Sequence, residues 1–170
     1  MTADESREVS KHGCHNIGLV VATRIRIRCN SPGLVEIAVI ETNAAIRMES
    51  LVHPWAPIDL IIQRRHHLTD DMVAGATTFG WILTDLLGVT DGRMILAYNS
   101  ESVFDAVIRE SRHAGLDPEH LEDPANWRSI AQARSNWLGH PDHYFPIPPT
   151  LRALGHCHAA LSVLRDIAAD

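Results

Sequence analysis

The chain has 170 residues, of which 45% are hydrophobic and 21% charged, the balance of a globular protein with one core. A net charge of −6 argues against an extended nucleic-acid-binding surface, which usually carries a basic excess. Apolar runs such as 17–22 are too short to span a bilayer, and residues 1–11 lack the apolar core of a secretion signal, so we expect a cytoplasmic protein. Three cysteines without C-x-x-C spacing predict no disulfide framework and no structural metal site. We also expect no cofactor.

The N-terminal part of the chain predicts a disordered segment, 1–16, followed by a single domain over 17–170. The continuous apolar run 17–22 is typical of a buried strand. Arginines then alternate with isoleucines, which extends the strand with one face exposed: Arg24, Arg26 and Arg28. These arginines could bind phosphates or form a solvated strand face. After a turn at 30–33, two more strands are expected, 34–40 and 46–52.

Beyond a proline-flanked loop at 53–57, the spacing of apolar residues becomes mainly helical. The expected helices are 72–75, 79–88, 102–114, 118–121, 126–137 and 155–168, with one strand at 93–98 and an extended loop at 139–149. Three strands, helices, a strand and further helices predict an α/β fold.

Six segments, taken in chain order, resemble the DEDDh-type 3′–5′ exonucleases, the family that includes the proofreading subunit of bacterial DNA polymerase III. They are 35–39 for the second strand, 51–58 for L-V-x-P…P-I, 67–79 for H-G-I-T-D-x-M-V and the stretch after it, 97–100 before the second catalytic motif, 152–155 for H-R-A-L-x-D, and the helix 157–168. The resemblance implies a ribonuclease-H-like fold, in which helices flank a mixed β-sheet.

The family's chemistry implies four carboxylates that hold two divalent ions and a histidine that activates water. At the matching positions this sequence has other residues, namely Ala22, Arg24, Val103 and His156 for the acids and Leu151 for the histidine. Acids are missing from all of 9–35 and 143–165, so the first and last motifs lack them in any register. We therefore predict that no catalytic metal binds and that the chain is not a working nuclease.

The register of each motif remains open. The first motif can alternatively fall on the neighbouring residues Val21 and Thr23. A two-residue insertion in the middle motif restores its acid as Asp105 instead of Val103, and two residues turn a helical side chain by about 200°. The last motif can alternatively take His158 as the base and Val163 at the acid. In every case at most one of the four carboxylates survives.

Three functions are compatible with this pattern. The first is a pseudo-exonuclease that binds a nucleotide or a single-stranded nucleic-acid end through Arg24, Arg26, Asn99 and Arg152. The second is a site reused for an unrelated small molecule, with His156 and Asp105 as candidate catalytic residues, because function resides in the site and not in the fold. The third is a scaffold that docks through Trp55 and 144–149, while Trp81, Trp127 and Trp137 are expected in the core.

Overall fold

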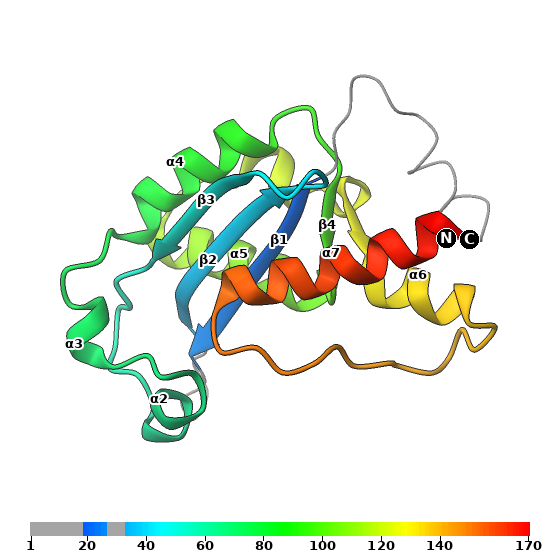
Figure 1. The fold of residues 1–170 in the computed structure, drawn as a ribbon. Coiled ribbons are helices and arrows are strands. Elements are labelled where there is room, and N and C mark those ends of the chain that lie inside the picture. Colours follow the sequence, from blue (N-terminus) through cyan, green and yellow to red (C-terminus); the bar gives the residue numbers. More distant parts are fainter. Residues whose placement is uncertain (1–18, 27–32) are drawn as a thin grey trace.

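The computed structural model describes residues 19–26 and 33–170. Within them, five strands form one mixed sheet in the order β3-β2-β1-β4-β5 (Figure 1). The antiparallel meander consists of β1 (Leu19–Arg26), β2 (Gly33–Glu41) and β3 (Ile46–Leu51). Next to β1 lie two strands parallel to it, β4 (Ile95–Ala97) and then β5 (Trp127–Ser129). The predicted mixed α/β sheet is thus confirmed, while the predicted disorder of 1–16 and the position of Arg28 lie outside the described residues.

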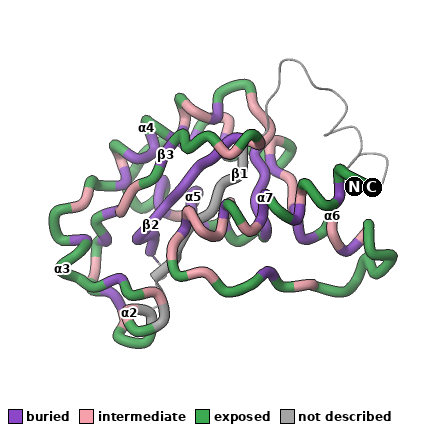
Figure 2. The backbone as a smooth tube through the Cα atoms, in the orientation of Figure 1, coloured by how far each residue is buried: buried purple, intermediate pink, exposed green. Residues whose placement is uncertain are grey.

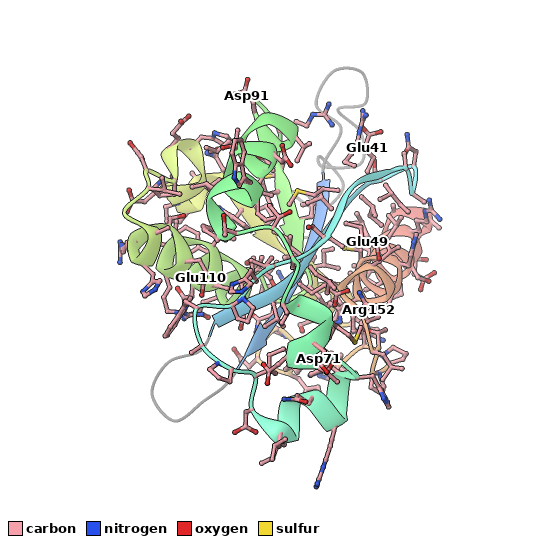
Figure 3. All side chains as sticks on the ribbon, turned by 90° about the vertical axis from the view of Figure 1, so that its left-hand side faces the viewer. Glu41, Glu49, Asp71, Asp91, Glu110 and Arg152 are labelled. Carbon is pink, nitrogen blue, oxygen red and sulfur yellow. The ribbon has the colours of Figure 1, made fainter. Side chains whose placement is uncertain are left out.

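Helices cover both faces of this sheet, with α7 (Ala153–Ala169) across one face and α4 (Phe79–Thr90) and α5 (Ser100–Ala114) on the other (Figures 1 and 3). On the same side as α7 lies α6 (Ile130–Trp137). Two short helices, α2 (Leu60–His66) and α3 (Asp70–Val73), lie beyond the end of β3. Two 3₁₀ turns, Glu119–Glu122 and Pro124–Asn126, lead into β5. Among the described helices, none has both the length and the apolar character needed to cross a membrane.

Strand β2 is the centre of the hydrophobic core, and every one of its residues is buried (Figure 2). Alternate side chains point to opposite faces of a strand. Ile37 and Val39 therefore pack against α4 and α5, whereas Ala38 and Ile40 pack against α6 and α7. Each fully buried aliphatic side chain contributes about 1.5–3 kcal/mol, so this strand fixes both helical layers on the sheet.

Local signals set both ends of α5. Asn99 caps its N-terminus by accepting a hydrogen bond from the Ser102 amide at 3.3 Å. At the C-terminus Gly115 adopts a left-handed conformation with φ of 67°, which costs glycine little. This helix therefore begins immediately after β4, at the parallel part of the sheet.

Several sequence expectations were wrong. Helix α2 was not predicted. Its apolar residues Leu60 and Ile61 are both exposed, so the sequence shows no amphipathic pattern there. The predicted helix 126–137 begins only at Ile130, since 127–129 pair with β4, a long-range contact that overrides local preference. Of the tryptophans expected in the core only Trp127 is buried, while Trp81 and Trp137 are exposed.

Candidate functional site

The predicted motif positions lie on three elements that meet around the central strand β1. Ala22 and Arg24 are in β1, and both α5 and α7 contact this strand. Val103 lies in the first turn of α5, and His156 lies in the first turn of α7. The fold therefore brings the elements of all the motifs together, as the resemblance implies. The side chains of Arg24 and Arg26 lie outside the described part of the chain, so their predicted phosphate contacts stay predictions.

The two registers of the middle motif place their acid position on different sides of α5. Val103 is buried among the side chains that join α4, α5 and the sheet, whereas Asp105 is exposed. Between them, Phe104 meets the ring of Trp127 edge to face, with centroids 5.9 Å apart. An exposed aspartate two residues along the helix does not replace a carboxylate at position 103, because it points to another face.

The two registers of the last motif place its acid position in different surroundings on α7. Val163, the alternative acid position, is buried in the α6–α7 core. His156 is partly buried, and its ring lies 6.3 Å from that of Tyr98 at an angle of 89°. Leu151, at the position of the family's general base, is exposed on the segment that precedes α7.

A buried carboxylate that the sequence reasoning did not identify lies beside these positions. Glu36 is the pairing partner of Arg24 across β1 and β2, and its exposed fraction is 0%. It accepts hydrogen bonds from Arg152 Nε at 2.5 Å and from the Ala153 amide at 2.9 Å. The one sequence signal was an acid in an otherwise apolar strand, which requires a buried partner.

Glu36 also supplies the N-terminal cap that α7 lacks in its own sequence. The N-cap residue is Arg152, whose side chain makes no capping hydrogen bond. A carboxylate from β2 instead accepts the first helical amide, which is favourable because the N-terminus of a helix carries partial positive charge. Arg152, predicted to bind ligand, thus contacts Glu36, although 41% of its side chain stays exposed.

Tyr98, which directly follows β4, anchors the segment 139–152 that connects α6 to α7. The Tyr98 hydroxyl donates a hydrogen bond to the Phe145 carbonyl and accepts one from Arg134 Nη1 at 3.1 Å. Ser135 Oγ donates to the His143 carbonyl at 2.6 Å. Between these anchors lies Tyr144, whose partial burial raises the pKa of its phenol above the ordinary value of 10.0.

The donor set of this region does not fit a pair of divalent ions. The motif positions carry methyl, isopropyl, guanidinium and imidazole groups in place of four carboxylates. Both oxygens of Glu36 accept hydrogen bonds from Arg152 and Ala153. Within the described residues, no cluster of three or more His, Cys, Asp or Glu side chains could hold a metal ion. Magnesium requires hard anionic oxygen ligands, and these side chains do not supply a set of them.

The sheet order, the helix after β4 and the final helix on the opposite face define the ribonuclease-H-like fold of DEDDh 3′–5′ exonucleases. Solved structures agree with this assignment. The nuclease domain of 3′hExo, a DEDDh family member bound to rAMP, has a TM-score of 0.62 at 12% identity, over 91% of this chain and 94% of that one. Exonuclease X in complex with 5′ overhanging duplex DNA has a TM-score of 0.56 at 22% identity, over 90% and 92%.

Exonuclease I of E. coli, in complex with a dT13 oligonucleotide, has a TM-score of 0.71 at 10% identity, over 90% of this chain and 41% of that chain. No family model matches the sequence, and no curated protein sequence matches it. The predicted fold is therefore confirmed at the level of structure, with little sequence identity to the exonucleases that share it.

Proposed function

We propose that this chain is a non-nucleolytic protein with an exonuclease fold, which binds a nucleotide or the end of a single strand without metal ions. The observation that carries the proposal is the environment of Glu36. This carboxylate lies beside the motif positions, and Arg152 and the Ala153 amide bind both of its oxygens. Its negative charge is thus used to hold α7, and the first and last motifs offer no acid of their own.

Electrostatics favours an anion over a cation at such a site. A divalent ion about 5 Å from an arginine is repelled by about 6 kcal/mol at an effective dielectric constant of about 20. A singly charged phosphate at the same distance gains about 3 kcal/mol. Arg24 lies on β1 opposite Glu36, and Arg152 is partly exposed at the start of α7. The fold relatives bound to rAMP and dT13 support a ligand of this class.

The proposal is tested by measuring binding of a 5′-labelled single-stranded oligonucleotide and of AMP in EDTA, at several salt concentrations. We expect binding without metal, and an affinity that falls as salt rises, because bound phosphates release counterions. Arg24→Ala should weaken binding, whereas Arg112→Ala should not, since Arg112 pairs with Glu122 away from the motif positions. Wild-type protein that binds neither probe, but is stabilised thermally by a non-nucleotide metabolite, would favour the reuse of the site for another small molecule.

A further inference from the structure

Tyr144 is an exposed aromatic residue that the structure holds in a fixed position. Its side chain is 55% exposed. On one side of Tyr144, the His143 carbonyl accepts a hydrogen bond from the Ser135 hydroxyl. On the other side, the Phe145 carbonyl accepts one from the Tyr98 hydroxyl. Further along, Arg134 Nη1 donates to the Pro146 carbonyl at 3.3 Å. The backbone on both sides of Tyr144 is therefore fixed to α6 and to the end of β4.

The ring of Tyr144 shares its buried neighbour, Tyr98, with His156 of the last motif. Tyr98 is buried, and two rings meet it nearly perpendicularly: Tyr144 at 6.0 Å and 75°, and His156 at 6.3 Å and 89°. His156 occupies the last motif position, and Tyr98 directly precedes Asn99, which begins the helix of the middle motif. One buried ring thus connects the exposed tyrosine with two motifs.

An exposed aromatic ring whose backbone is held on both sides is suited to a nucleobase. Stacking of a base on an aromatic side chain contributes about 1–3 kcal/mol and tolerates any base, because every base has a π-face. Little side-chain entropy is lost on binding when the ring is already held. We propose that Tyr144 stacks on the base of the terminal nucleotide. This inference rests on the proposed function and makes the ligand a base-bearing end of any sequence.

The test compares two single strands that differ only in the terminal 3′ residue, which carries a base in one and is abasic in the other. Dissociation constants are measured in EDTA for wild type, Tyr144→Ala and Tyr144→Phe. We expect Tyr144→Ala to weaken binding of the strand with the base by about 5- to 150-fold, the equivalent of one stacking contact. Binding of the abasic strand should not change, and Tyr144→Phe should behave as wild type because stacking requires only the ring.

The control variant is Trp81→Ala, which removes a 71% exposed aromatic side chain from α4, on the other face of the sheet. It should bind both strands as wild type does. Thermal unfolding of Tyr144→Ala reports whether the segment 139–152 keeps its fold. Wild type that binds neither strand would contradict the proposed function itself. Wild type that binds both, with Tyr144→Ala affecting the two strands equally or not at all, would overturn only the stacking role.

Discussion

Strand β2 carries two buried glutamates, Glu36 and Glu41, which use the same chemistry for different purposes. Figure 3 shows Glu41 at one end of the sheet and Arg152, the partner of Glu36, on the α7 side. Glu41 accepts hydrogen bonds from Arg47, from Arg93 at 3.0 Å and from Asn43 at 3.0 Å. These partners hold the β2–β3 turn to the loop between α4 and β4.

Glu36 instead binds Arg152, which lies 116 positions further along the sequence. Its second partner is a backbone amide of helix α7, that of Ala153. In both cases the buried glutamate holds in place the segment that carries its arginine partner. At one end of β2 that segment is a turn, and at the other it is the start of the helix that carries the last motif. Substitutions at the two ends of β2 test this contrast.

Removing the arginine at the Glu36 end should cost the most stability. Arg152→Ala leaves Glu36, which is 0% exposed, with the hydrogen bond from the Ala153 amide but without its arginine. An uncompensated buried charge costs about 3–5 kcal/mol. We expect about 3 kcal/mol, measured by urea unfolding at neutral pH, because Arg152 is partly exposed and water can replace it. A loss below about 1 kcal/mol, the size of a surface pair, would show that the pair is not effectively buried.

Removing the acid of the same pair should cost less. Glu36→Gln keeps an oxygen that can accept the Ala153 amide, and the freed Arg152 can turn into solvent. We expect about 1–2 kcal/mol, since the lost interaction is a hydrogen bond to a charged group. The order of the two variants is the sharper result. If Glu36→Gln destabilised the protein more than Arg152→Ala, burial of the carboxylate would not be the dominant effect.

At the other end of β2, the contribution of Glu41 should depend on pH. Hydrogen bonds from Arg47 and then Arg93 hold the pKa of Glu41 below its ordinary value of 4.5. A lowered pKa in the folded state adds stability above pH 4.5, and this stability is lost as the pH falls through the lowered pKa. Wild type should therefore be more stable than Glu41→Gln at neutral pH, with the gap closing in acid. A gap that stayed constant from about pH 6 to about pH 3 would contradict the ion pairs.

The smallest effect is expected for a third arginine–glutamate pair, which is exposed. Arg112 Nη2 lies 3.2 Å from Glu122 Oε1, and the two side chains are 73% and 54% exposed. Exposed pairs contribute about 0–1 kcal/mol, so Arg112→Ala should unfold nearly as wild type does. High salt should remove any remaining difference in stability between Arg112→Ala and wild type. A cost equal to that of Arg152→Ala would mean that burial does not distinguish these pairs.

Much of the fold could be predicted from the sequence because its signals are local. The apolar runs 17–22 and 34–40 and the helical spacing of 102–114 and 155–168 each identify an element without knowledge of the rest. The helix α2 and the strand β5 could not be predicted. Leu60 and Ile61 stay exposed, and 127–129 form a strand only because β4 lies beside them.

The sequence allows the motif positions to be assigned to residues, but it does not show the contacts that those residues make. The missing acids follow from counting residues between Glu8 and Glu36. The hydrogen bond from Arg152 to Glu36 could not be predicted in this way. It joins two segments that are distant in the sequence, and only the folded structure shows that they meet. The position of Tyr144 could not be predicted either, because the hydrogen bonds that hold its neighbours come from distant residues.

The central claim is that this exonuclease fold binds a nucleic-acid end but does not cut it. The most direct measurement incubates purified protein with a 5′-labelled single strand in Mg²⁺, in Mn²⁺ and in EDTA, and follows both binding and strand length. At matched ionic strength, we predict binding in all three conditions and a strand of unchanged length. Metal-dependent shortening that disappears in a His156→Ala variant would contradict the claim.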